Sequence, residues 1–143
     1  MPRTASHKLA GSYIVATTSC KLPDLLKLTE AVAGETVGTG LYRGAKARIT
    51  VVGRNQGSLQ FRIGASKAMM TFRVNVERAQ GGSRLTSRIT AFRTNQSMFL
   101  GLIPSGPKQL VGWNFYSNFM ANLADSLYEL DPEADVEIIE QPG

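Results

Sequence analysis

Apolar and polar residues alternate with a period of two over residues 41–94, a pattern typical of an antiparallel sheet with one buried and one exposed face. Turn signals at 55–57 and 80–83 divide this segment into strands. A looser alternation over 9–17, with Tyr13 and Val15 in phase, predicts a further first strand. In the main segment, the positions expected to face inward are Ala45, Ala47, Ile49, Val51, Leu59, Phe61, Ile63, Met70, Phe72, Val74, Val76, Leu85, Ser87, Ile89 and Ala91.

Two other segments have a period near 3.6 and predict helices. Residues 22–33 form a short amphipathic helix, with Gly34 ending it. Residues 107–130 form a longer helix, with Pro107 in the first turn and Pro132 beyond the end. Its broad apolar face consists of Gln109, Gly112, Trp113, Tyr116, Phe119, Met120, Leu123, Ala124, Leu127 and Leu130.

These elements predict an α+β fold in which a curved antiparallel sheet wraps around a long C-terminal helix, with a short N-terminal helix beside it. The 143 residues fit one domain, which we assign to residues 1–130. Residues 131–143 form an acidic tail, either frayed or a marginal last strand. The apolar segment 97–103 is a lid, a dimer contact or a turn buried in the core, the last being the default.

The composition excludes several classes of protein. Hydrophobic residues make up 43% of the chain and charged residues 19%, as in globular proteins. No apolar run approaches the roughly 20 residues needed to span a bilayer. The N-terminus has charge but no apolar core behind it, so it is not a secretory signal. One cysteine, Cys20, cannot form an internal disulfide, and together these features favour the cytoplasm.

Charge is distributed unevenly along the chain. Residues 1–124 contain all 16 lysines and arginines and four acids, whereas residues 125–143 contain seven acids and no base. A basic body with an acidic tail can bind anions, or the tail can screen the body. The same distribution also fits a solvated surface with no partner.

Small and large residues are mixed where the sheet is expected to meet the long helix. Ala47, Ser87 and Gly112 leave room that aromatic residues surround, as in a pocket for an apolar ligand. The alternative is a well-packed core in which small residues fit against large ones. Arg43 and Arg93, at strand ends, either hold an anionic group at the mouth or are solvated. The candidate ligand-binding residues are Trp113, Tyr116, Phe119, Met120, Ser87, Phe72, Arg43 and Arg93.

The sequence gives little support for catalysis. His7 is the only histidine, so a His/Cys zinc site or a Ser-His-Asp triad is not expected. Gly38-Thr39-Gly40 lacks the third glycine of a dinucleotide-binding motif, and no P-loop occurs. We therefore predict no metal and no cofactor, and we assign no catalytic residue.

The order of elements resembles the START-like (SRPBCC) superfamily, which includes polyketide cyclase/dehydrase-like proteins and relatives of a small component of carbon monoxide dehydrogenase. The matching features are the Gly-Gly-Ser-Arg-Leu-Thr turn at 81–86 and the Trp113–Leu127 helix with its Phe119–Leu123 spacing. The resemblance covers 9–130 and is to an abbreviated copy, because only residues 35–40 separate the first helix from the sheet. It implies a helix-grip fold that holds a hydrophobic ligand between sheet and helix, with catalysis in only some members.

The favoured function is therefore a binding or carrier protein for a small hydrophobic molecule. One alternative is an anion- or nucleic-acid-binding module, although its basic sheet face has almost no aromatic residues for base stacking. Another is a cyclase or dehydratase that uses tyrosine and arginine. A homodimer is compatible with all three. The residues of the basic face are Lys46, Arg48, Arg62, Arg73, Arg84 and Arg88.

Overall fold

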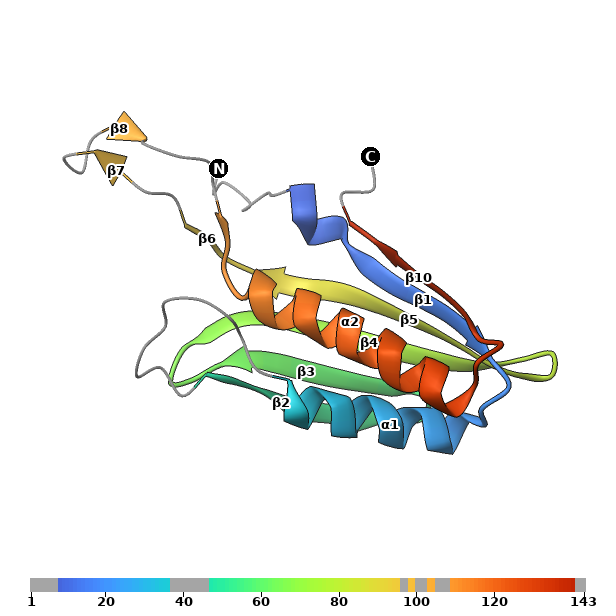
Figure 1. Ribbon diagram of the computed structural model, residues 1–143. Helices are drawn as coiled ribbons and strands as arrows, with labels where there is room; N and C mark the ends of the chain where they lie inside the picture. The colour runs from blue at the N-terminus through green and yellow to red at the C-terminus, as the bar shows by residue number, and fades with distance from the viewer. Residues whose placement is uncertain (1–7, 37–46, 96–97, 100–102, 105–108, 141–143) are drawn as a thin grey trace.

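The structure is a computed structural model that describes residues 8–36, 47–95, 98–99, 103–104 and 109–140, and the statements below concern these residues. Its architecture is α+β, with two helices covering one face of a six-stranded antiparallel sheet (Figure 1). The main elements are a 3-10 turn at Lys8–Gly11, β1 (Tyr13–Thr18), α1 (Leu22–Glu35), β2 (Arg48–Asn55), β3 (Ser58–Gly64), β4 (Ala68–Ala79), β5 (Gly82–Phe92), α2 (Trp113–Leu130) and β10 (Asp135–Ile139).

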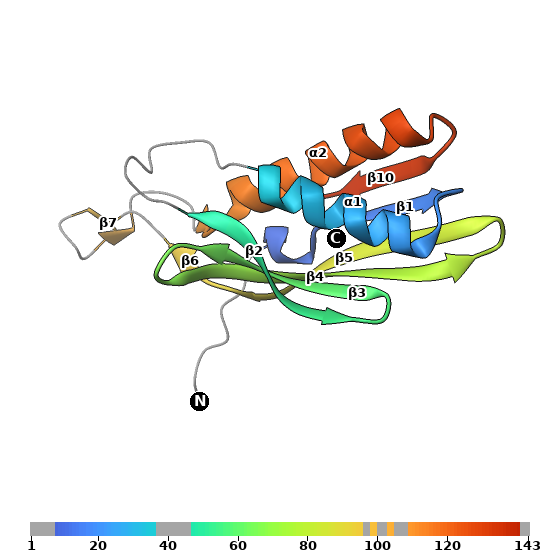
Figure 2. The ribbon, with the colours of Figure 1, turned by 90° about the horizontal axis from the view of Figure 1, so that it is seen from below.

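The strand order in the sheet is β10-β1-β5-β4-β3-β2. Strand β1 joins the two ends of the chain, because Val15 is opposite Thr86 of β5 on one side and Glu137 of β10 on the other. Of the two alternatives for residues 131–143, a strand is therefore observed, over Asp135–Ile139. The sheet is neither closed nor strongly curled, so the predicted wrapping around the C-terminal helix is not seen (Figure 2).

Both helices lie side by side on the same face of the sheet (Figure 2). The prediction for α1 is confirmed, and its buried residues Leu25, Thr29, Val32 and Ala33 follow the helical period. Asp131, just after α2, accepts hydrogen bonds from the Ser19 amide at 3.0 Å and the Thr18 hydroxyl at 2.7 Å. These bonds, led by that of the Ser19 amide, lower the pKa of the Asp131 carboxyl and connect the end of α2 to β1.

Helix α2 begins six residues later than predicted. Gly112 has φ 89°, a left-handed conformation that cannot be part of an α-helix. The residues before it, Gln109–Leu110 (β9), pair instead with Thr94–Asn95 (β6). The predicted first turn at Pro107 lies outside the described residues. The apolar face is otherwise confirmed, except that Leu130 is 61% exposed.

The inward phase of the sheet is confirmed for β3 and β4, where Leu59, Phe61, Ile63, Met70, Phe72, Val74 and Val76 are buried. The prediction for Ala91 is wrong. A bulge places Phe72 opposite Ile89 but Thr71 opposite Ala91, so Thr90 is the extra residue and Ala91 turns outward. In β1 the buried residues are Ile14 and Ala16, one position out of phase with the predicted alternation.

A bulge in β2 has a similar effect. The register shifts between Val51 and Gly53, so Val52 is the extra residue and is exposed. Beyond the bulge, Arg54 is opposite the buried Leu59, on the side of the helices. There it forms an ion pair with Glu30 of α1.

The segment 97–103 is described only in part. The backbone of Met98–Phe99 (β7) pairs with that of Ile103–Pro104 (β8) in a separate two-stranded ladder. The remaining residues lie outside the described ranges, so the three interpretations of this segment stay predictions. Within the described parts of the chain, neither helix has the length and apolar character needed to cross a membrane.

Candidate functional site

Four of the predicted ligand-binding residues meet in the core between the sheet and α2. Phe72, Tyr116, Phe119 and Met120 are all fully buried. The ring centroid of Phe72 lies 5.0 Å from those of both Tyr116 and Phe119. These are contact distances for aromatic pairs. The side chains therefore pack against one another, in agreement with the well-packed-core alternative for this part of the interface.

Ser87 and Tyr116 form a buried hydrogen-bond chain. The Tyr116 hydroxyl donates to the carbonyl oxygen of Ser12 at 2.9 Å, so its oxygen accepts from Ser87 Oγ at 2.7 Å. Ser87 Oγ in turn accepts from the amide of Ile14 at 3.0 Å. Burial raises the pKa of Tyr116 to about 12, an effect that the bond with Ser87 partly offsets. The two hydroxyls thus have structural partners that hold β1 to β5 and α2.

The other predicted residues are separate from this core cluster. Trp113 is half-buried at the start of α2, with its ring edge-on to that of Tyr116 at 6.1 Å. Arg93 is exposed, and its carbonyl oxygen accepts a hydrogen bond from the amide of Val111. Arg43 lies outside the described residues. The structure therefore does not bring Arg93 together with the buried residues.

The outer face of the sheet, opposite the helices, is basic. Arg73 of β4 is directly opposite Arg88 of β5. Both side chains are exposed, and like charges at opposite positions on neighbouring strands repel. Arg73 donates a hydrogen bond to Gln60, whereas Arg88 makes no polar contact among the described residues. We call the outward residues of β2–β5 the basic face: Arg48, Thr50, Ser58, Gln60, Arg62, Thr71, Arg73, Asn75, Glu77, Arg84, Thr86, Arg88 and Thr90.

Negative charge on the basic face is nearly absent. Glu77, opposite Arg84, is the only acid in strands β2–β5. Within the described ranges the one ion pair is that of Arg54 with Glu30, on the other side of the sheet. The four central arginines of the face (Arg48, Arg62, Arg73 and Arg88) therefore have no acidic partner in the described structure. The polar groups between them are mainly hydroxyls and amides, which also hydrogen-bond phosphate.

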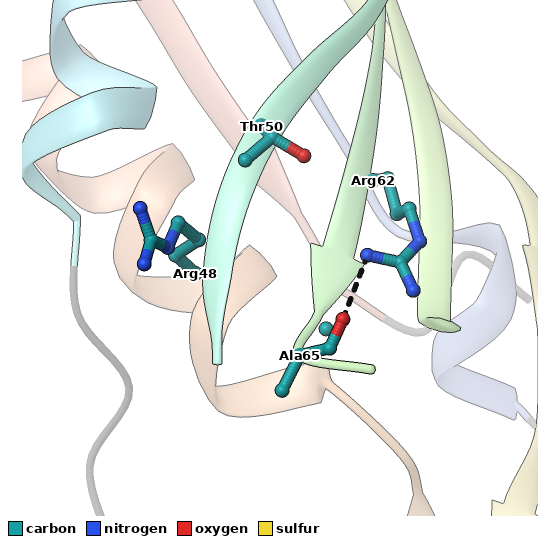
Figure 3. A pocket seen from close by; sticks show the side chains of 5 residues that line it. Arg48, Thr50, Arg62 and Ala65 are labelled. Atoms are coloured by element: carbon teal, nitrogen blue, oxygen red, sulfur yellow. Dashed lines mark hydrogen bonds between the residues drawn. The ribbon is translucent and has the colours of Figure 1, made fainter. Parts of the chain in front are cut away.

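One end of the basic face contains a hollow of about 330 Å³, lined by Arg48, Thr50, Arg62, Gly64 and Ala65 (Figure 3). Arg48 is opposite Gly64, and Thr50 is opposite Arg62. The Arg62 guanidinium donates to the carbonyl oxygens of Ala65 at 3.1 Å and Ser66 at 3.3 Å. Arg48 extends away from Arg62 on the other side of β2. No acidic residue lines this hollow.

The opposite end of the same side has a mixed character. A second hollow, of about 310 Å³, is lined by Val15, Thr17, Arg84, Asp135 and Glu137. The two acids belong to β10, the edge strand. The acidic C-terminal strand thus bounds the basic face next to β1.

Sequence periodicity already assigned the basic residues to the outer side, but it did not pair them. The turn at Gln80-Gly81 places Ala79 opposite Gly82, and counting back along both strands from that pair puts Arg73 opposite Arg88. This signal was available in the sequence. The hollow was not, because its register depends on the bulge at Val52.

Searches against family models, curated proteins and solved structures give no match to this chain. The site must therefore be judged on its chemistry. Within the part of the chain that the structure describes, no group of three or more His, Cys, Asp or Glu side chains is arranged to hold a metal ion.

Proposed function

We propose that the protein is a binding module whose basic face holds duplex nucleic acid through the phosphate backbone. The observation that carries this proposal is the placement of Arg73 opposite Arg88 without an acidic partner in the described structure. Such a pair lowers the stability of the free protein. A polyanion lying across β4 and β5 would supply the missing negative charge to both guanidinium groups.

Duplex nucleic acid fits the basic face better than other polyanions. Single-strand binding sheets use aromatic side chains as stacking platforms, and the basic face has none. An anionic membrane surface favours apolar groups beside the cations, and the outward positions of β3 and β4 are polar. Hydroxyl and amide groups between arginines, such as Thr71 and Gln60, match contacts to phosphate oxygens.

Salt-dependent binding tests the proposal. Fluorescence anisotropy with a labelled DNA duplex should show binding at low salt that weakens steeply as salt increases. Replacing Arg73 and Arg88 by Gln should weaken binding and reduce the slope of log K against log salt by about 2, because each lost phosphate contact contributes roughly 0.9. The matched control replaces Lys21 and Lys27 by Gln, which removes the same charge from the exposed α1 side.

Three results would contradict this function. The full chain could fail to bind the duplex at low salt. The control variant could lose as much affinity as the Arg73/Arg88 variant, which would indicate a general charge effect. Anionic vesicles could bind while the duplex does not, which would identify a lipid surface as the partner.

A second candidate function is the carrier of a small hydrophobic ligand, with the START-like, helix-grip assignment that it implies. The observation in its favour is a half-buried apolar group at the start of α2, formed by Met69, Phe92 and Trp113. A ligand would enter at this end of the core, beside Gly112. Titration with fatty acids and aromatic polyketides, monitored by Trp113 fluorescence, tests it. Saturable changes that Trp113→Phe removes would support this candidate, and unchanged fluorescence and melting temperature with every ligand would end it.

A further inference from the structure

We propose that the hollow between Arg48 and Arg62 is a phosphomonoester site, which receives the terminal phosphate of a nucleic-acid strand lying on the basic face. This inference rests on the proposed function and adds a specific end group to it. The hollow lies beside the edge strand β2, where a duplex crossing the sheet would leave it (Figure 3).

The hollow exists because a side chain is missing at Gly64. This residue is opposite Arg48, and a Cβ at Gly64 would lie 2.3 Å from the carbonyl oxygen of Lys67. No larger residue fits without moving the turn that follows β3. Bare backbone therefore forms the floor, and the side chains of Arg48, Thr50 and Arg62 form the walls.

The hydrogen bonds to Ala65 and Ser66 fix the position of the Arg62 guanidinium beside the hollow. A guanidinium has five N–H donors, so this orientation leaves three for a ligand. Among the described residues, Arg48 and the Thr50 hydroxyl make no hydrogen bond. Arg48 is exposed, so turning its guanidinium toward the hollow breaks no contact with another described residue.

Two arginines and a hydroxyl suit a phosphomonoester better than a carboxylate. A terminal phosphate has close to two negative charges at neutral pH and three acceptor oxygens. A carboxylate has one charge and is satisfied by a single arginine fork. The hollow, at about 330 Å³, is near the lower end of the range for ligand sites, roughly 300–1,000 Å³, which leaves room for the group attached to the phosphate.

Two duplexes of one sequence, with 5′-phosphate or 5′-hydroxyl ends, provide the test. The unmodified protein should bind the phosphorylated duplex roughly threefold to fivefold more tightly, the effect of about one exposed charge pair. Arg48→Gln and Thr50→Val should remove this difference and still bind the hydroxyl-ended duplex. The matched control, Arg84→Gln, lies on the same face away from the hollow and should keep the difference. Circular dichroism melting confirms that each variant is folded.

The outcomes separate the two proposals. Equal affinity of the unmodified protein for both duplexes would overturn the phosphate site and leave the proposed function intact. A preference that persists in both Arg48→Gln and Thr50→Val would overturn its assignment to this hollow. If neither duplex binds, the proposed function fails, and titration with inorganic phosphate decides the site. Amide NMR shifts confined to 48–50 and 62–65 would then support an anion site for free phosphate, and their absence would overturn it.

Discussion

The hydroxyl oxygen of Tyr116 lies 2.7 Å from Ser87 Oγ in a core from which both side chains are almost excluded from solvent. With Ser12 and Ile14 at its two ends, this chain of hydrogen bonds satisfies every hydroxyl in it. Two residues that a ligand-binding hypothesis assigns to a pocket therefore already have polar partners within the protein. Their loss should affect stability before it affects binding.

Tyr116→Phe should lower the free energy of unfolding by roughly 1–3 kcal/mol, because the Ser12 carbonyl and the Ser87 hydroxyl both lose a buried partner. Urea unfolding followed by circular dichroism measures the difference. Tyr128→Phe is the control, since its exposed hydroxyl makes only a 3.4 Å contact with Val136, and it should change stability by less than about 0.5 kcal/mol. Equal effects of the two substitutions would contradict the structural role of Tyr116.

Alkaline pH should selectively weaken the protein with tyrosine at 116. The pKa of Tyr116 is about 12 in the folded state and about 10 when unfolded, so between these values the folded state binds more protons. The stabilising effect is complete below pH 10 and decreases as pH rises toward 12. The stability advantage over Tyr116→Phe should therefore fall by about 1.4 kcal/mol per pH unit in this window. A constant difference from pH 8 to 12 would contradict the raised pKa.

Much of the fold follows from periodicity because a buried side chain must return to the same face. Phe61 and Phe72 illustrate this, since strict alternation places both of them in the core. Ala91 shows the limit. The extra residue Thr90 turns it outward, and nothing in the local pattern of apolar residues marks that bulge.

The candidate site was predictable to a similar degree. A two-residue turn determines the Arg73–Arg88 pair, so this feature can be derived from the sequence. The hollow requires Arg48 opposite Gly64, and without the bulge at Val52 the register would differ by one residue. Gly112 also illustrates a tertiary cause. Its left-handed backbone packs close to Met69 and Met70, and it sets the start of α2 against a helical pattern that continues through it.

Arg88→Thr should stabilise the free protein by about 0.2–1 kcal/mol at low ionic strength, because it removes the repulsion from Arg73. Arg84→Thr is the matched control, since Arg84 is opposite Glu77 and its replacement removes an attraction. Both changes introduce the same strand-favouring residue, so the difference between them isolates charge. Urea midpoints at low and high salt measure it. A lower stability for Arg88→Thr than for Arg84→Thr would contradict the unbalanced pair.

Two glycines should respond to alanine in opposite directions. Gly34 lies in α1 with open space around its Cβ position, so Gly34→Ala should stabilise the protein by up to about 1 kcal/mol. A Cβ at Gly82 would lie 1.9 Å from the carbonyl oxygen of Thr18, so β1 and β5 would have to separate. Gly82→Ala should therefore destabilise by about 1–3 kcal/mol or more. Thermal melting compares them, and a neutral Gly82→Ala would contradict the close approach of these strands.

The acids of β10 should limit how far a polyanion extends across the sheet. Asp135 and Glu137 are opposite Thr17 and Val15 at the border of the basic face. Replacing them by Asn and Gln removes two negative charges from the path of a bound duplex, and duplex affinity at low salt should rise severalfold. The control replaces Asp125 and Glu129, which are exposed on α2, and should have a smaller effect because the sheet separates them from the basic face. Equal gains in both variants would mean that net charge alone governs binding, and the border assigned to β10 would then be wrong.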